Sequence, residues 1–132
     1  MPPFEIRTRV EVRWRDLDML GHLNQSVYHE FLEEARAAFF QEARSGAWEA
    51  FVLARVELDY KSEVRRDHGH VEIAVRLERV GTSSVTVGHD VLLPDGTLAA
   101  TGRSVLVGWD PHERRSRPFG DEERERLNAA LA

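Results

Sequence analysis

The chain has 132 residues and a mass of 15.1 kDa, enough for one domain with a buried core and too few for two. It contains no cysteine, which excludes disulfides, thiolate nucleophiles and cysteine-ligated metal sites and fits a reducing cytoplasm. A net charge of −5 and a pI near 5.7 argue against nucleic-acid binding, and no apolar run approaches the roughly 18 residues of a membrane span. We therefore expect a cytoplasmic protein, with residues 1–132 forming a single domain that has neither nucleic acid nor membrane as partner.

The first predicted element is a β-strand over residues 6–14. Apolar and polar side chains alternate there with a period of two, as in a strand with one covered face. The covered face is predicted to carry Ile6, Thr8, Val10, Val12 and Trp14. Two acids, Asp16 and Asp18, follow the strand.

A tight polar link through Gly21, His22 and Asn24 leads into a predicted amphipathic helix of about 20 residues. Its apolar side chains recur at helical spacing: Tyr28, Phe31, Leu32, Ala35, Ala38 and Phe39. Asn24 or Ser26 can supply the N-cap oxygen, and Gly46 provides a stop. A carboxylate thus lies within a few residues of a helix start, where unpaired N–H groups gather. Hydrolysis of an activated carbonyl needs this pair of groups, one to attack or to activate water and one to stabilise the oxyanion.

The rest of the chain returns to a period of two, with predicted strands over 52–61, 71–78, 83–93 and 98–109 and a short charged helix over 121–131. Short turns at Gly81–Thr82 and at 94–96 require antiparallel pairing. The fold class is therefore α+β, a five-stranded antiparallel sheet that wraps around one long helix. Because one helix covers only part of such a sheet, we expect an edge to pair with a second copy of the chain.

The element order and the motif W-x-D-x-D-x-x-G-H-x-N-x-x-x-Y-x-x-x-x-E-x-A-R resemble the 4-hydroxybenzoyl-CoA thioesterase family of single hot-dog domains. The matching residues are Trp14, Asp16, Asp18, Gly21, His22, Asn24, Tyr28, Glu33 (or Glu34), Ala35 and Arg36. The resemblance also covers 59–61 and the turn at 81–84. It departs from the family at Gln25, where a second Asn is common, and in the link 62–66, which often contains Pro.

The resemblance implies an acyl-CoA thioesterase that forms a homodimer or homotetramer and needs no cofactor, since coenzyme A is part of the substrate. It assigns the catalytic carboxylate to Asp18 and the oxyanion-binding backbone N–H to about Gln25, a role that a change of side chain tolerates. Asp18 is then either a general base for water or a nucleophile that forms a mixed anhydride. Its structural alternative is an acid that caps the turn or the helix.

The neighbouring polar residues have a catalytic and a structural interpretation each. His22 can titrate near neutral pH or hold the Asp18 loop by hydrogen bonds. Asn24 acts as a cap or loop tether more readily than as a substrate contact. Asp16 alternates away from Asp18, which favours a structural role or a salt bridge with a neighbouring Arg.

Substrate contacts are predicted at Tyr28 and Tyr60, which can border the acyl pocket, and at Ser84. Arg65 and Arg66 are candidates for the coenzyme A phosphates, together with Arg114, Arg115 and Arg117. Ser83 and Ser84 lack the partners of a serine-hydrolase triad.

Two rival sites are disfavoured. Glu33 and Glu34 are the other candidate carboxylates, but they lie two to three turns past the helix start, where a salt bridge or a solvated face is favoured. His68 and His70 with Asp67 could begin a metal site, but the spacing suggests no further ligand. We therefore predict no metal.

The sequence leaves two other functions open: an enoyl-CoA hydratase or dehydratase on the same fold, and a non-catalytic homo-oligomer that binds acyl ligands. The acyl chain and the carrier, coenzyme A or acyl carrier protein, are not determined by these residues.

Overall fold

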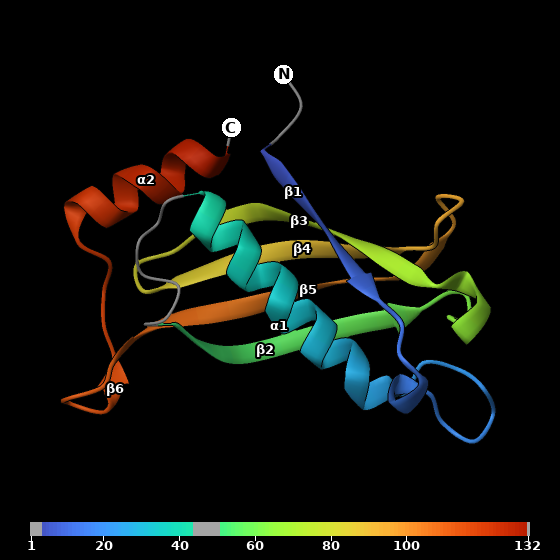
Figure 1. Ribbon diagram of the computed structural model, residues 1–132. Coiled ribbons are helices and arrows are strands. Elements are labelled where there is room, and N and C mark those ends of the chain that lie inside the picture. The colour runs from blue at the N-terminus through green and yellow to red at the C-terminus, as the bar shows by residue number, and fades with distance from the viewer. Residues whose placement is uncertain (1–3, 44–50, 132) are drawn as a thin grey trace.

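The computed structural model describes residues 4–43 and 51–131, and its main elements follow the predicted order (Figure 1). The strands are β1 (Glu5–Glu11), β2 (Phe51–Tyr60), β3 (His70–Val80), β4 (Ser84–Leu92), β5 (Leu98–Asp110) and the two-residue β6 (Arg115–Ser116). The helices are α1 (Gln25–Glu42) and α2 (Asp121–Leu131), with short 3₁₀ helices η1 (Trp14–Asp16) and η3 (Arg66–His68). The predicted strands and both predicted α-helices are confirmed to within a few residues.

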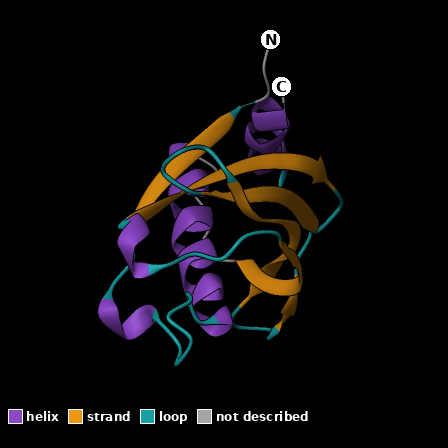
Figure 2. Ribbon diagram, turned by 90° about the vertical axis from the view of Figure 1, so that its right-hand side faces the viewer, coloured by secondary structure: helices purple, strands orange, loops and turns teal. Residues whose placement is uncertain are grey.

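All paired strands are antiparallel, in the order β1-β3-β4-β5-β2, with β6 added to β5. The sheet curls around α1, which packs against β1 and β3 (Figure 2). This is the hot-dog fold, and the predicted α+β class is confirmed; β6 and the two 3₁₀ helices were not predicted. β1 and β2 form the two edges of the sheet, so β2 pairs with only one described strand.

The core lies between α1 and the inner face of the sheet. The helix buries most of its predicted stripe and also two residues outside that prediction, Arg36 and Phe40. The sheet contributes its alternate inner residues, among them Val71, Ile73, Val75, Val85, Val87, Val91 and Leu106. Each fully buried aliphatic side chain stabilises the fold by about 1.5–3 kcal/mol. The buried contacts hold α1 in place and leave its N-terminus free at one end of the sheet (Figure 1).

The prediction that Trp14 ends the first strand on a covered face was wrong. β1 stops at Glu11, and Trp14 begins η1 with 77% of its surface exposed. The cause is Asp16, which is 1% exposed and accepts hydrogen bonds from the Arg13 backbone N–H (2.7 Å) and from the Arg13 guanidinium (3.0 and 3.2 Å). These bonds close a tight turn that ends the extended backbone.

The predicted alternation in β2 was wrong at its start. A bulge between Leu53 and Arg55 inserts one residue, so that Leu53 lies opposite Leu106 and Val56 lies opposite Ser104. Because opposite residues share a face, Leu53 and Val56 are both on the inner face. Val52, which period two had grouped with Val56, is on the outer face.

The start of α1 is set by Asn24, whose backbone is extended and whose side-chain oxygen accepts from the Ser26 N–H at 3.1 Å. Asn24 is therefore the N-cap, as predicted. Gly46, the predicted stop, lies outside the described residues, and the described helix ends at Glu42.

Candidate active site

A cavity of about 530 Å³ opens at the N-terminus of α1. Its walls come from the loop after η1, the first turn of the helix, the end of β2 and the link to β3. They consist of Asp18, His22, Leu23, Asn24, Gln25, Tyr28, Tyr60, Lys61, Ser62, Glu63 and Val64. A second hollow, of about 640 Å³, lies on the other side of Asp18 and includes Trp14, Met19 and Gly21 in its lining. The structure thus brings together Asp18, His22, Asn24, Gln25, Tyr28 and Tyr60, six of the nine predicted site residues.

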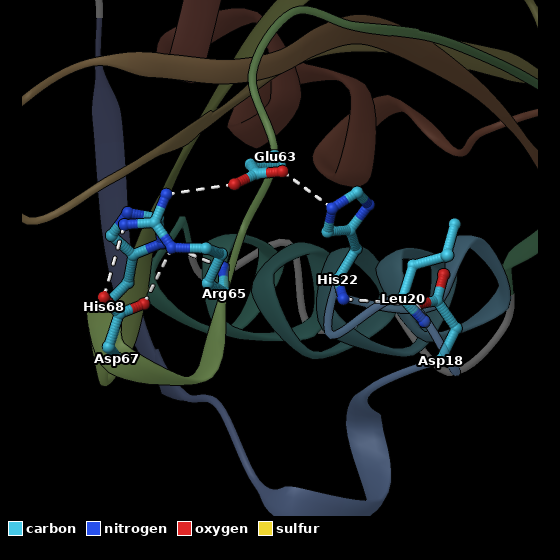
Figure 3. Close-up of polar contacts among 7 residues, drawn as sticks. All are labelled: Asp18, Leu20, His22, Glu63, Arg65, Asp67 and His68. Carbon is cyan, nitrogen blue, oxygen red and sulfur yellow. Dashed lines mark hydrogen bonds and ion pairs between the residues drawn. The ribbon is translucent and has the colours of Figure 1, made fainter.

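Asp18 is exposed and held by the backbone of its own loop. One carboxylate oxygen, Oδ1, accepts from the Leu20 N–H at 2.9 Å and from the His22 N–H at 3.1 Å (Figure 3). The loop closes because the Asp18 N–H donates to the His22 carbonyl at 2.8 Å and because Gly21 adopts a φ of +78°, which glycine tolerates without strain. The other oxygen, Oδ2, has no protein partner among residues 4–43 and 51–131. One oxygen is therefore fixed, and the other is available to water or substrate.

The first turn of α1 contains an unpaired N–H, which belongs to Gln25, a residue that lines the same cavity. The Asn24 side chain satisfies the Ser26 N–H, and the Val27 N–H donates to the Asn24 carbonyl at 2.9 Å. Within the described part of the chain the Gln25 N–H has no hydrogen-bond partner. No acidic side chain lies in this first turn, so nothing there neutralises the partial positive charge of the helix N-terminus. The Gln25 N–H can therefore donate a hydrogen bond to an oxygen atom that gains negative charge during a reaction.

His22 reaches away from Asp18 to the link after β2. Its Nε2 lies 2.7 Å from Oε2 of Glu63, whose other oxygen accepts from Arg65 at 3.0 Å (Figure 3). The hydrogen bond from Arg65, followed by the charge of His22, lowers the pKa of the Glu63 carboxyl. His22 thus holds the loop by both its main chain and its ring, while the ring remains on the cavity wall.

Two aromatic rings form another wall. Tyr28 is 4% exposed and meets Tyr60 edge to face with 5.0 Å between ring centroids. Burial raises the pKa of the Tyr28 phenol to about 12, which keeps it neutral. Tyr60 is half exposed on the edge strand β2. An acyl group entering the cavity would meet these two rings.

The predicted salt bridge of Asp16 with a neighbouring Arg is confirmed by the Arg13 contacts. Those contacts lower the pKa of the Asp16 carboxyl in spite of its burial, which alone would raise it. Asp16 therefore stays ionised and fixes the turn before the Asp18 loop.

Three predicted substrate contacts lie outside the cavity lining. Arg65 is paired with Glu63 and Asp67, and the Arg66 guanidinium lies over the Trp14 ring at 6.0 Å. Ser84 lies at the start of β4 opposite Val107, whereas Tyr60 pairs with Ala100 at the other end of β5. Within one chain, Ser84 is therefore at the opposite end of the sheet from the cavity.

The lining includes Lys61, Ser62 and Glu63, which sequence reasoning did not propose as site residues. Glu63 was noted only as a departure from the family pattern. Nothing in the sequence signals its contact with His22, because the two residues belong to separate segments that meet only in the fold. Lys61 is the only lysine of the chain, and this was the one feature of the sequence that set it apart from other surface residues.

The rival carboxylates lie elsewhere on α1. Glu33 borders a separate cavity of about 240 Å³ with Arg36 and Phe40, and Glu34 lies near β1 beside Arg13. Both are exposed. Among the described residues, no three His, Asp or Glu side chains gather closely enough to hold a metal ion. None of the described helices is long and apolar enough to cross a membrane.

Comparison with known proteins gives one family for nearly the whole chain. Residues 12–127 match the thioesterase-like superfamily. A thioesterase from Thermus thermophilus, crystallised with coenzyme A and Zn, is 38% identical, with a TM-score of 0.83 over 95% of this chain and 93% of that one. A protein from Pseudomonas aeruginosa, described as a putative thioesterase, is 30% identical, with a TM-score of 0.80 over 96% and 97% of the two chains.

A curated relative is more distant in sequence. The long-chain acyl-CoA thioesterase FadM of Escherichia coli is 28% identical over 129 residues, which span 92% of this chain and 96% of FadM. The similarity therefore extends over the full domain.

Proposed function

This chain belongs to the thioesterase-like superfamily, and on that premise we propose that it hydrolyses the thioester of an acyl-coenzyme A to a free acid and coenzyme A. The observation that carries the proposal is that a carboxylate and an unpaired backbone N–H belong to residues that line one cavity. Asp18, which has one carboxylate oxygen without a partner in the described chain, and Gln25, whose N–H is unpaired there, both line the cavity at the first turn of α1. A carboxylate and an oxyanion donor are the two groups that the reaction requires.

In the proposed reaction the thioester carbonyl oxygen accepts a hydrogen bond from the Gln25 N–H. Either Asp18 removes a proton from water as the water attacks, or Asp18 attacks and the resulting mixed anhydride is hydrolysed by water. In both chemistries the carbonyl carbon becomes tetrahedral and its oxygen takes the negative charge. The C–S bond then breaks and the thiolate of coenzyme A leaves. This step gives the free acid directly when water has attacked, and the mixed anhydride when Asp18 has attacked; water then hydrolyses the anhydride to the free acid and the Asp18 carboxylate. Loss of the N–H donor would raise the barrier by roughly 3–4 kcal/mol.

The similar proteins support this substrate class. The Thermus thermophilus thioesterase was crystallised with coenzyme A, and FadM is a long-chain acyl-CoA thioesterase. The finer resemblance to 4-hydroxybenzoyl-CoA thioesterases supports Asp18 as the catalytic carboxylate. The Tyr28 and Tyr60 rings would contact the acyl group, aromatic or aliphatic.

The test is a thiol-release assay over a panel of aromatic, short and long acyl-CoA esters. Wild type should release thiol from at least one class, and Asp18→Asn should lower kcat by at least about 100-fold. Asp95→Asn is the matched control, since Asp95 is also an exposed turn acid that accepts from a backbone N–H, Thr97 at 2.9 Å, but lies between β4 and β5. It should keep wild-type activity.

A fully active Asp18→Asn variant would contradict the proposal and direct attention to Glu33 or Glu34. Loss of enoyl absorbance without thiol release would select the hydratase alternative. Ligand binding without any turnover would select the non-catalytic binder.

The proposal includes a homodimer or homotetramer. The edge strand β2 pairs only with β5 among the described strands, and it exposes Val52 (37%), Leu53 (44%) and Tyr60 (50%). A second copy placed along this edge would cover those side chains and reach the cavity wall at Tyr60. Sedimentation at micromolar concentration should give at least a dimer, and a monomer there would contradict this part of the proposal.

A further inference from the structure

The contact between Glu63 and His22 joins the Asp18 loop to a distant segment of the chain. His22 Nε2 lies 2.7 Å from Glu63 Oε2, both side chains are half exposed, and both residues line the cavity (Figure 3). The main chains also meet here. His22 forms an isolated antiparallel bridge with Arg65, and the Leu23 N–H donates to the Val64 carbonyl at 2.7 Å. The loop that carries Asp18 is thus fastened to the link between β2 and β3.

Glu63 is itself held in place. Its Oε1 accepts from Nη1 of Arg65 at 3.0 Å, and Arg65 is anchored on its other side by Asp67 at 2.9 Å. His68, the remaining titratable neighbour, accepts from the Arg65 N–H through its Nδ1 at 2.9 Å and adds positive charge when it is protonated. Since the hydrogen bond from Arg65 lowers the pKa of the Glu63 carboxyl, this group is ionised at neutral pH and only accepts hydrogen bonds.

The Glu63 carboxylate, which accepts at His22 Nε2, determines which ring nitrogen of His22 carries the proton. Neutral imidazole has one N–H, and a carboxylate at 2.7 Å from Nε2 draws the proton to that nitrogen. Nδ1 then has a free lone pair, and among the described residues it has no hydrogen-bond partner. The ring therefore offers an acceptor on the wall of the cavity that also contains the free oxygen of Asp18.

We propose that Glu63 is a positioning residue, which fixes the ring orientation and the tautomer of His22 so that Nδ1 holds the hydrolytic water beside Asp18. This inference rests on the proposed function, since His22 would bind the water molecule that takes part in the proposed hydrolysis. It applies whether that water attacks the thioester or a mixed anhydride. The logic is that of a carboxylate that orients a histidine in a hydrolase, where an amide in its place permits the wrong tautomer.

The kinetic test uses Glu63→Gln, which keeps the size of the side chain but can present either an acceptor or a donor to His22. We expect kcat to fall about 10-fold, with KM within about twofold of wild type, as for other residues that orient a ligand or base from behind. Asp67→Asn is the matched control, because the amide oxygen of Asn can still accept from Arg65 and Asp67 has no hydrogen bond or ion pair with His22. It should leave kcat unchanged.

A second comparison separates action through His22 from general damage to the loop. In a His22→Phe background, Glu63→Gln should have no further effect on kcat, because the group it orients is gone. Additive losses of kcat in the double variant would overturn the proposal. The same kcat in Glu63→Gln as in Asp67→Asn would also overturn it.

A spectroscopic test needs no substrate. The ¹⁵N chemical shifts of His22 at pH 8 should show the Nε2–H tautomer in wild type and in Asp67→Asn, and a mixture of tautomers in Glu63→Gln. Equal tautomer populations in all three proteins would overturn the proposal. If no acyl-CoA ester is cleaved by wild type, the proposed function fails, and the ¹⁵N result still decides whether Glu63 sets the state of His22.

Discussion

The helix α1 is in contact with two polar clusters that use similar residues in opposite surroundings. At its N-terminus, Asp18, His22 and Glu63 are exposed or half exposed around an open cavity. Deeper along the helix, Arg36, His89 and Ser104 are buried, with 7%, 0% and 0% of their surface exposed, and Arg36 also borders the cavity beside Glu33. Each cluster contains a histidine, but the charged partners are acids in the open cluster and an arginine in the buried one, and the two clusters also differ in burial.

The buried cluster is built around one hydroxyl. Ser104 Oγ accepts from Nη1 of Arg36 at 3.3 Å and lies 2.9 Å from Nε2 of His89. Burial, and then the charge of Arg36, lowers the pKa of His89 to about 4. His89 Nδ1 has no partner among the described residues. This cluster is therefore a cost to stability that its few hydrogen bonds only partly offset.

The open cluster has the reverse arrangement. Main-chain N–H groups fix one oxygen of Asp18, and the groups without a partner in the described chain, Asp18 Oδ2 and the Gln25 N–H, border a cavity that solvent reaches. An unpaired polar atom lowers the stability of the fold little where water can replace the missing partner. It lowers the stability much more where water cannot reach it. From this difference we expect substitutions in the open cluster to alter turnover, and substitutions in the buried cluster to alter stability.

The largest effect on stability should come from Ser104→Ala. Removal of the hydroxyl deprives both Arg36 and His89 of their shared partner, which should lower the free energy of unfolding by about 4 kcal/mol. The kcat for thioester hydrolysis, per folded molecule, should not change. Urea denaturation and the thiol-release assay measure the two quantities.

The corresponding substitution in the open cluster is Asp18→Asn. It should change the free energy of unfolding by less than about 0.5 kcal/mol. If Ser104→Ala lowered kcat while Asp18→Asn lowered stability, the two clusters would have exchanged roles and the comparison would be wrong.

A smaller effect should appear on acidification. An unfolded chain protonates His89 below about pH 6.5, whereas the folded chain keeps it neutral down to about pH 4. Between these values the unfolded state binds more protons, so the free energy of unfolding should fall as the pH falls, by at most about 3 kcal/mol from this group. Above pH 6.5 His89 should contribute no pH dependence.

Urea denaturation of wild type and His89→Gln from pH 7 to pH 4.5 isolates this contribution. The variant should lose less stability over that range than wild type. Parallel pH profiles would mean that the burial of His89 does not control its protonation.

The elements of the fold were predictable because period two and period 3.6 dominate their residues. The first strand was predicted to end three residues later than it does, because the alternation continues through Val12 and Trp14 while the backbone already turns with Asp16. The bulge in β2 was missed since an inserted Ala54 leaves the apolar composition unchanged.

The candidate site was predictable as far as it is local in sequence. Asp18, His22, Asn24 and Gln25 lie within eight positions of one motif, and the fold keeps them together. Glu63 was missed as a site residue because its role depends on a contact between separate segments. Arg36, Ser104 and His89 were missed as a cluster for the same reason, since they come from α1, β5 and β4.

The proposed function requires that Asp18 and the Gln25 N–H act on the same carbonyl group. A crystal structure of Asp18→Asn with a non-hydrolysable ketone analogue of an acyl-CoA tests it most directly. We expect the analogue's carbonyl oxygen about 3 Å from the Gln25 nitrogen, with its carbonyl carbon facing the side chain at position 18. A carbonyl group bound away from the helix N-terminus, for example in the cavity beside Glu33 and Arg36, would contradict it.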